Sequence, residues 1–129
     1  MAKKKIMIIE DDMFVMDIYQ TKFSLEGFEV ISAENGIEAL KKIEKENVVP
    51  DLMLLDIVMP YMDGLEVLKR LKENKNVSGV PVILLTNLSQ KEQVSRGLEL
   101  GASDYLIKSH FTPSEVMEKI RVYLKPETA

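Results

Sequence analysis

The chain has 129 residues, and its 17 basic and 21 acidic side chains give a formal net charge of −4. This length suits one domain, and the mild acidity disfavours a dedicated nucleic-acid-binding protein, which usually carries a basic excess. Because there is no cysteine, a disulfide scaffold, a thiolate metal site and a cysteine nucleophile are excluded. The apolar runs are far shorter than the ~20 residues of a membrane span, and the lysines at 3–5 do not begin a signal peptide. We therefore expect a cytoplasmic domain that does not contact a membrane.

Five short apolar runs alternate with longer segments of helical periodicity. The runs predict strands at residues 6–9, 28–31, 52–55, 80–85 and 105–107. Continuous apolar runs are typical of parallel strands that are buried on both faces, and their alternation with helices indicates βαβ units with right-handed crossovers. Glu29 interrupts the second run, and Asp104 and Lys108 flank the fifth, so we expect these two strands at the edges of the sheet.

Apolar side chains at helical spacing predict five helices and their buried faces. In chain order the anchors are Phe14, Ile18 and Leu25; Ile37, Leu40 and Ile43; Leu65, Leu68 and Leu71; Val94, Leu98 and Leu100; and Val116, Ile120 and Leu124. Asp12 is a candidate cap for the first helix. Capping boxes at residues 89–92 and 112–115 predict the starts of the last two. The fourth helix has few clear anchors, and we expect it to be the most loosely held.

Four of the predicted strands end directly before a residue able to do chemistry. Glu10 and Asp11 follow the first strand, Asp56 the third, Thr86 the fourth and Lys108 the fifth. The carboxyl ends of parallel strands share one edge of the sheet, where open α/β folds bind their ligands. An acid after a strand is by itself most often a solvated turn residue or a cap. The joint pattern instead predicts that these side chains converge in one crevice.

The chemistry of such a crevice points to a divalent cation and a phosphoryl group. Three carboxylates in one place repel each other unless a cation neutralises them, and oxygen ligands without His or Cys favour Mg²⁺. A carboxylate can act as a nucleophile and form an aspartyl phosphate. Phosphoryl transfer needs mainly positioning and charge neutralisation, which Mg²⁺ and a lysine can supply.

Four segments carry a resemblance to a known family. They are Ile-Ile-Glu-Asp-Asp at residues 8–12, Asp-Leu-Met-Leu-Leu-Asp-Ile-Val-Met-Pro at 51–60 with Asp63 and Gly64, Pro-Val-Ile-Leu-Leu-Thr at 81–86, and Gly-Ala-Ser-Asp-Tyr-Leu-Ile-Lys at 101–108. In this order and spacing they resemble the CheY-like, stand-alone receiver domain of two-component response regulators. The resemblance covers residues 1–129 and implies a single receiver domain with no output domain. It also implies an α/β, flavodoxin-like (βα)5 three-layer sandwich with strand order 2-1-3-4-5.

The resemblance implies a phosphoacceptor and a metal site. Asp56 would accept a phosphoryl group from a sensor histidine kinase or a histidine phosphotransfer protein. Glu10, Asp11 and Asp56, with the backbone carbonyl of Val58, would hold Mg²⁺, and Mn²⁺ is possible. Glu10 stands where aspartate is more frequent in the family.

The resemblance also implies a switch and a protein partner. Thr86 and Lys108 would contact the phosphoryl group, and Tyr105 would turn inward when Thr86 moves. From the sequence alone, an edge-strand aromatic packed on a helix is the favoured reading of Tyr105. The fourth helix, fifth strand and fifth helix would form the output surface for a downstream protein, without direct contact to nucleic acid. The chain would be a monomer or a phosphorylation-dependent homodimer.

Several positions depart from the common family pattern. Ser109 follows Lys108 where proline is usual, and because a non-proline cis peptide costs about 3 kcal/mol, we expect a trans bond. Asn87 stands where a small residue usually leaves room for the phosphodonor. Val58 and Leu88 occupy positions that tune hydrolysis in this family, and both are apolar. They cannot orient an attacking water, so we predict slow autodephosphorylation.

Two other readings remain open at this point. The chain could be a degenerate receiver that serves only as a protein-interaction module, because Asn87 and Ser109 depart from the pattern. It could also be a Mg²⁺-dependent phosphatase with Asp56 as nucleophile. Haloacid-dehalogenase-type phosphatases place an acid two residues after the nucleophile, where this chain has Val58, so this reading is disfavoured. We expect a phosphoacceptor that assists its own phosphoryl transfer and is not otherwise an enzyme.

Overall fold

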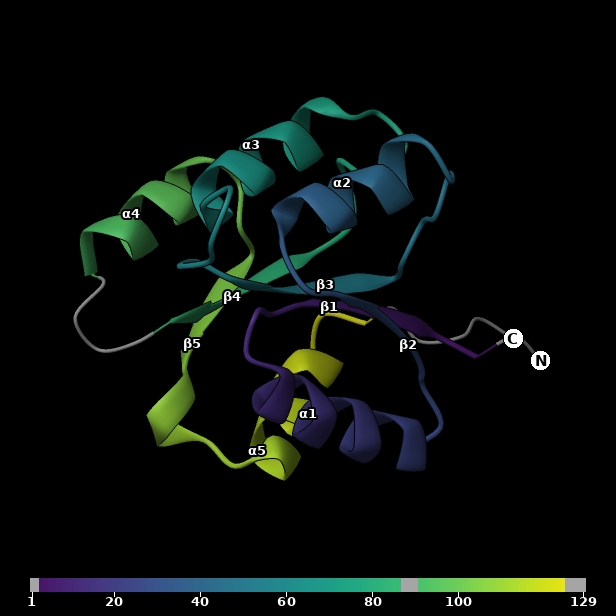
Figure 1. The fold of residues 1–129 in the computed structure, drawn as a ribbon. Coiled ribbons are helices and arrows are strands. Elements are labelled where there is room, and N and C mark those ends of the chain that lie inside the picture. The colour runs from purple at the N-terminus through teal and green to yellow at the C-terminus, as the bar shows by residue number, and fades with distance from the viewer. Residues whose placement is uncertain (1–2, 87–90, 125–129) are drawn as a thin grey trace.

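The computed structural model describes residues 3–86 and 91–124. Within these residues, five strands form one parallel sheet in the order β2-β1-β3-β4-β5, which confirms the expected flavodoxin-like topology. The strands, shown in Figure 1, are β1 (Lys5–Ile9), β2 (Glu29–Ala33), β3 (Leu52–Asp56), β4 (Val82–Thr86) and β5 (Asp104–Ile107). As expected, β2 and β5 lie at the edges, and β1, β3 and β4 occupy the centre.

Helices cover both faces of the sheet, so the molecule has three layers (Figure 1). One face carries α1 (Met13–Leu25) and α5 (Pro113–Arg121), and the other carries α2 (Gly36–Glu44), α3 (Gly64–Glu73) and α4 (Lys91–Glu99). A short 3₁₀ turn, Lys108–His110, follows β5. None of the helices in the described part of the chain is long and apolar enough to cross a membrane.

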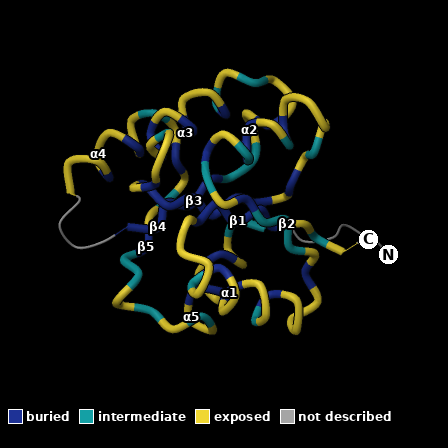
Figure 2. The backbone as a smooth tube through the Cα atoms, viewed as in Figure 1, coloured by how far each residue is buried: buried dark blue, intermediate teal, exposed yellow. Residues whose placement is uncertain are grey.

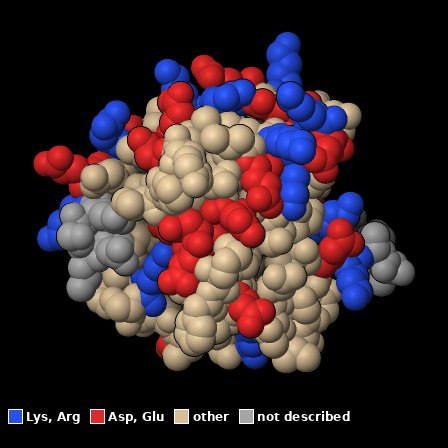
Figure 3. Space-filling view, viewed as in Figure 1, with Lys and Arg blue, Asp and Glu red and all other residues tan. Residues whose placement is uncertain are grey.

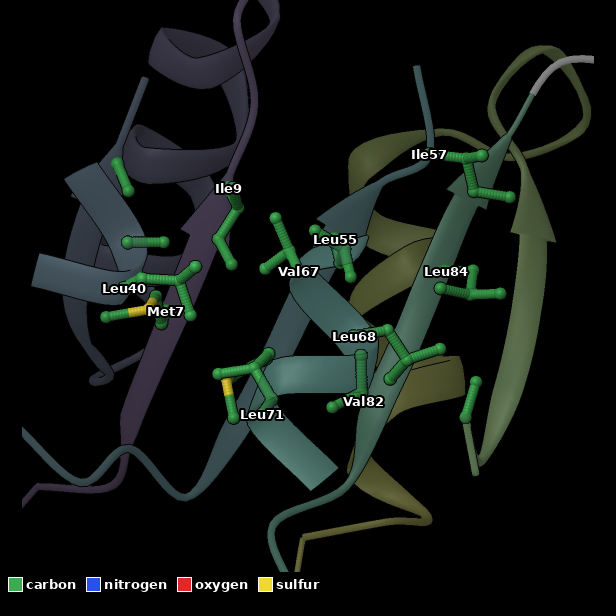
Figure 4. Packing of buried hydrophobic residues seen from close by; sticks show 14 of the residues in the cluster. Met7, Ile9, Leu40, Leu55, Ile57, Val67, Leu68, Leu71, Val82 and Leu84 are labelled. Atoms are coloured by element: carbon green, nitrogen blue, oxygen red, sulfur yellow. The ribbon is translucent and has the colours of Figure 1, made fainter. Parts of the chain in front are cut away.

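The core consists of two apolar clusters, one on each face of the sheet. In β1, Met7 and Ile9 belong to the cluster under α2 and α3, whereas Ile6 and Ile8 belong to the cluster over α1 and α5. This is the two-residue period of a strand that is buried on both faces. Figure 4 shows the first cluster, in which α3 packs Val67 over the central strands. Figure 2 shows that burial is concentrated along the sheet, where the hydrophobic driving force acts.

The predicted buried face of α1 is wrong. Phe14 and Leu25 are 76% and 78% exposed, and Ile18 is exposed as well. The side chains that face the sheet are Met16, Tyr19 and Phe23. Both stripes have helical spacing, and two aromatic rings bury more apolar area than the aliphatic side chains would. The consequence is that α1 presents large apolar side chains to its surroundings.

The other helices agree better with the predicted faces. The predicted anchors of α3 are all buried, and Leu40, Ile43, Val116 and Ile120 are buried as expected. Ile37 and Leu98 were predicted to be buried but are exposed. In α4 only Val94 and Gly97 are buried, which fits the expectation of a loosely held helix.

Strands β1 and β5 begin one residue earlier than predicted, whereas β2 and β4 begin one and two residues later. β2 begins at Glu29, because the amide of Phe28 donates to the Phe23 carbonyl in the turn that ends α1. β4 begins at Val82, since the preceding Pro81 has no amide hydrogen for the ladder. The apolar side chain of Phe28 is nevertheless buried.

The caps explain where two helices begin. Asp12 accepts hydrogen bonds from the amides of Phe14 and Val15 and is the N-cap of α1. The Thr112 amide donates to Glu115 at 2.9 Å and the Glu115 amide donates back to the Thr112 hydroxyl at 3.2 Å, so the predicted capping box of α5 is confirmed. The box predicted at residues 89–92 lies partly outside the described residues, and α4 begins at Lys91.

Candidate active site

Three carboxylates meet where β1 and β3 end. Glu10 and Asp11 follow β1, and Asp56 is the last residue of β3, the neighbouring strand. One oxygen from each lies within 4.8 Å of the others. Glu10 and Asp56 are buried, the latter with 5% of its surface exposed, whereas Asp11 is exposed. Figure 3 shows acidic side chains gathered in the middle of the face shown, between α1 and the helices on the other side of the sheet.

Lys108 connects two of these carboxylates. It begins the turn after β5, and its Nζ donates to Glu10 Oε1 at 2.8 Å and to Asp56 Oδ2 at 3.1 Å. Burial by itself lowers the pKa of Lys108, but the hydrogen bond to Glu10 and the charge of Asp56 outweigh it and raise that pKa above its ordinary value. The Lys108–Ser109 peptide is trans, as expected. The ammonium is therefore held in the crevice as a permanent positive charge.

Asp56 has an environment that disfavours its ionised form. Burial raises the pKa of Asp56, the charge of Glu10 raises it further, and Lys108 lowers it, with a resulting pKa of about 7. Its Oδ1 accepts from the Val58 amide at 3.2 Å. A cation in the crevice would offset the repulsion by Glu10 and favour the carboxylate.

Glu10 is fixed from two sides. Besides the bond from Lys108, its Oε2 accepts from the Asp12 amide at 3.1 Å, at the start of α1. The positive end of the helix dipole favours an anion there. Glu10 thereby couples the acidic cluster to the first turn of α1.

Thr86 and Tyr105 share a surface pocket beside the crevice. Thr86 is the buried last residue of β4 and pairs with Ile107 in the neighbouring strand β5. Together with Val94 and Leu98 of α4, these residues line a pocket of about 290 Å³. Tyr105 is 41% exposed and is one of the residues that line this pocket.

The structure brings Glu10, Asp11, Asp56 and Lys108 together at the carboxyl edge, and Thr86 ends β4, the strand next to β3. Val58 lies in the loop after β3 with an exposed side chain, and its amide contacts Asp56. Asn87 and Leu88, which were expected to affect access and hydrolysis, lie outside the described residues.

The sequence alone did not reveal that Gly64 allows α3 to start close to the backbone at Asp56. Its amide donates to the Ile57 carbonyl at 2.7 Å, and a Cβ atom on Gly64 would lie 2.5 Å from the backbone oxygen of Asp56. No side chain fits there, so only glycine lets α3 start against the backbone that carries Asp56. The Asp-Gly pair at residues 63–64 was the signal in the sequence.

Comparison with known proteins identifies the family to which this chain is similar. The chain matches the response regulator receiver domain family over residues 6–121. It is 42% identical over 125 residues to the probable transcriptional regulator ycf27 of Porphyridium aerugineum, which covers 97% of this chain and 50% of that protein. It is 38% identical over 122 residues to the alkaline phosphatase synthesis transcriptional regulatory protein PhoP of Bacillus subtilis, which covers 95% and 49%.

A solved structure gives the same result for the fold. The chemotaxis response regulator CheY4 of Vibrio cholerae has a TM-score of 0.87 to this chain at 26% identity, with 95% of this chain and 100% of that chain covered. The chain spans about half the length of the curated relatives it matches. By its sequence match and its fold, the chain belongs to the receiver domain family of two-component response regulators.

Proposed function

We propose that Asp56 is the phosphoacceptor of this chain and that a histidine kinase or a histidine phosphotransfer protein is its phosphodonor. The observation that carries the proposal is the position of Asp56. Its carboxylate is buried among two further acids, and a lysine ammonium lies 3.1 Å from Oδ2. An acid with both a neighbouring cation and a cation-binding cluster is suited to phosphoryl transfer, which depends on charge neutralisation.

The chemistry balances with residues of this chain and a phosphohistidine. A carboxylate oxygen of Asp56 forms a bond to phosphorus, and the bond between phosphorus and the imidazole nitrogen of the donor breaks. The electron pair of that bond remains on the imidazole, which takes up a proton from solvent. Lys108 would donate hydrogen bonds to the phosphoryl oxygens, and Thr86, at the end of the next strand, would bind another.

The donor set of the crevice fits Mg²⁺. Glu10, Asp11 and Asp56 offer only oxygen ligands, and the Val58 carbonyl would complete the protein's share, since Mg²⁺ usually retains several waters. When bound there, Mg²⁺ or Mn²⁺ supplies positive charge that neutralises the phosphoryl oxygens. The pairing of Glu10 and Asp56 with a single ammonium supports this assignment, because the cluster keeps an excess of negative charge.

The proposed switch runs from Thr86 to the surface of α4, β5 and α5. Movement of Thr86 toward a phosphoryl group would open the shared pocket to the ring of Tyr105, and α4, with two buried residues, is held weakly enough to respond. Beryllofluoride with Mg²⁺ should change the amide chemical shifts from Thr86 to Tyr105. Changes confined to the neighbourhood of Asp56 would contradict the switch.

This surface would transmit the signal to a protein partner. The relatives named as transcriptional regulators are about twice as long as this chain. That this chain acts without an output domain and without direct nucleic-acid contact stays a prediction, as does a phosphorylation-dependent homodimer.

Intact-protein mass spectrometry after incubation with acetyl phosphate and Mg²⁺ tests the proposal. We expect a stable mass gain of one phosphoryl group that is lost in Asp56→Asn and retained in Asp17→Asn, an exposed acid on α1. Continuous release of phosphate would favour the phosphatase reading. No gain in the wild-type chain would favour an interaction module.

A further inference from the structure

Tyr19 is buried on the sheet-facing side of α1. Only 5% of its surface is exposed, and its ring packs against Phe23 with 5.8 Å between the ring centres. It belongs to the apolar cluster on the side of the sheet that α1 and α5 cover (Figure 1). The hydroxyl of a buried tyrosine usually finds a hydrogen-bond partner. The surroundings of this hydroxyl therefore indicate what Tyr19 does besides packing.

The carboxylates of the crevice project toward the same side of the sheet. Side chains alternate between the two faces of a strand, so Asp56, two residues after Leu54 in β3, faces the side that Leu54 faces. Glu10 stands two residues after Ile8, which belongs to the same cluster. Its amide continues the ladder of β1 by donating to the Ala33 carbonyl at 3.0 Å. Both acids therefore lie on the side of the sheet that α1 covers.

The hydroxyl of Tyr19 lies within electrostatic reach of a buried ion pair. Lys108 Nζ is 2.8 Å from Glu10 Oε1. Burial has the largest effect and raises the pKa of Tyr19, the charge of Lys108 lowers it, and the charge of Glu10 raises it. Because the net direction is upward, the phenol is neutral at pH 7 and can donate a hydrogen bond.

This hydroxyl is not committed to another group of the described chain. It makes no direct hydrogen bond to residues 3–86 or 91–124. Since none of the fully buried side-chain oxygens of these residues lacks a partner, the Tyr19 hydroxyl reaches solvent. Tyr123 differs, because its hydroxyl donates to Asp104 Oδ2 at 2.6 Å. Tyr19 thus keeps a free donor near the crevice.

Phosphorylation of Asp56 would change the partners of Lys108. The ammonium now donates to Glu10 and to Asp56. A phosphoryl group carries more negative charge than the carboxylate on which it forms, so it attracts the ammonium more strongly. Glu10, which has no exposed surface, would then lose a charge-assisted hydrogen bond. A buried carboxylate in this position needs a replacement donor.

We propose that Tyr19 is a positioning residue whose hydroxyl donates to Glu10 as Lys108 turns from Glu10 to the phosphoryl oxygens. The inference rests on the proposed function of Asp56 and deepens it. With acetyl phosphate as donor, a carboxylate oxygen of Asp56 forms a bond to phosphorus, the bond between phosphorus and the acetate oxygen breaks, and acetate keeps the electron pair. Tyr19 touches none of these atoms and acts only by releasing Lys108.

The first test removes the hydroxyl and keeps the ring. In Tyr19→Phe we expect the rate of phosphorylation by acetyl phosphate at saturating Mg²⁺ to fall about three- to tenfold, which is the effect of one hydrogen bond. The thermal unfolding midpoint should stay that of the wild type, because the hydroxyl has no direct partner in the unphosphorylated chain. The control is Tyr123→Phe, which also loses a hydroxyl but should keep the wild-type rate.

The second test asks whether Tyr19 acts through Lys108. In a Lys108→Met background, Tyr19→Phe should not lower the rate further, because there is no ammonium left to release. The side-chain ¹⁵N resonance of Lys108 supplies a spectroscopic readout. Addition of beryllofluoride and Mg²⁺ should shift this resonance in the wild type and shift it less in Tyr19→Phe.

The outcomes separate this inference from the proposed function. A wild-type rate and a wild-type Lys108 shift in Tyr19→Phe would overturn the inference and leave Asp56 as phosphoacceptor. A slower rate that comes with a lowered unfolding midpoint and adds to the effect of Lys108→Met would make Tyr19 a structural residue, which also overturns it. Failure of wild-type Asp56 to react with acetyl phosphate would instead remove the proposed function, and this inference with it.

Discussion

Lys108 Nζ lies 2.8 Å from Glu10 Oε1 and joins the end of β5 to the end of β1 across 98 positions of sequence. Glu10 is fully buried, and the same ammonium also binds Asp56. This arrangement leaves one cation between two buried carboxylates. Charges buried in this way are costly unless each keeps a partner. The stability of the crevice should therefore depend on Lys108.

Replacing Lys108 by methionine should destabilise the domain. The volume is similar, but Glu10 and Asp56 lose their counterion and must repel each other or take up a proton. We expect the free energy of unfolding at pH 7 to fall by about 2–4 kcal/mol, measured by urea denaturation. Mg²⁺ should stabilise Lys108→Met more than the wild type, because a bound cation replaces the missing ammonium. Lys69→Met, at an exposed position on α3, is the control and should change little. Equal stability of the two variants would contradict the interpretation.

The raised pKa of Asp56 predicts a specific pH dependence. Its pKa in the folded state is about 7, well above the 3.8 of a solvent-exposed aspartate in an unfolded chain. Between these values the folded state binds the proton more tightly than the unfolded state, so the stabilisation is present at low pH and is lost as pH rises through about 7. We expect the wild-type free energy of unfolding to decrease from pH 5 to pH 8 relative to that of Asp56→Asn, which lacks this titration.

Urea denaturation at several pH values, with and without Mg²⁺, checks this prediction. Asp56→Asn should be more stable than the wild type at pH 8, and the difference should shrink at pH 5. Mg²⁺ should flatten the wild-type curve, because a cation in the crevice favours ionised Asp56 in the folded state. Parallel pH profiles for wild type and variant would show that the buried carboxyl titrates normally.

Much of the site could be predicted because a parallel sheet brings all its carboxyl ends to one edge. That rule alone predicts that Glu10, Asp56 and Lys108 lie together, although these three residues are far apart in the sequence. The buried face of α1 could not be predicted in the same way. Its two stripes share the helical period, and only packing against the sheet selects the one that contains Tyr19. The positive φ of Tyr61 was also not predictable, since tyrosine carries no signal for such a backbone conformation.

Gly97 should control how closely α4 packs on β4. A Cβ atom there would lie 2.4 Å from Leu84 Cδ1, so Gly97→Ala forces one of them to move. In a helix, alanine is more favourable than glycine by up to about 1 kcal/mol. Forcing an additional methyl group into a packed core, however, costs about 1–3 kcal/mol. We therefore expect Gly97→Ala to lower the hydrogen-exchange protection of α4. Gln93→Ala, an exposed position on the same helix, should not lower it.

A second substitution separates overpacking from other effects of Gly97→Ala. Leu84→Val removes the Cδ atoms that the new methyl group meets. By itself it should cost about 1 kcal/mol through lost burial. Combined with Gly97→Ala it should cost less than the sum of the two single changes, a favourable coupling in a double-mutant cycle. Additive effects would show that Leu84 is not the obstacle.

Val58 should determine how long Asp56 remains phosphorylated. Its amide contacts Asp56 Oδ1, while its exposed side chain stands beside the crevice and offers no hydrogen-bonding group to an attacking water. Val58→Asn would supply a donor and an acceptor that can orient an attacking water, and such positioning should speed hydrolysis by on the order of tenfold. We expect a shorter phosphoryl lifetime in Val58→Asn, followed as loss of the phosphoryl mass after removal of acetyl phosphate. Val58→Ala opens the crevice without adding a polar group, so its lifetime should stay close to that of the wild type. If Val58→Ala hydrolyses as fast as Val58→Asn, access of water and not its orientation limits the reaction.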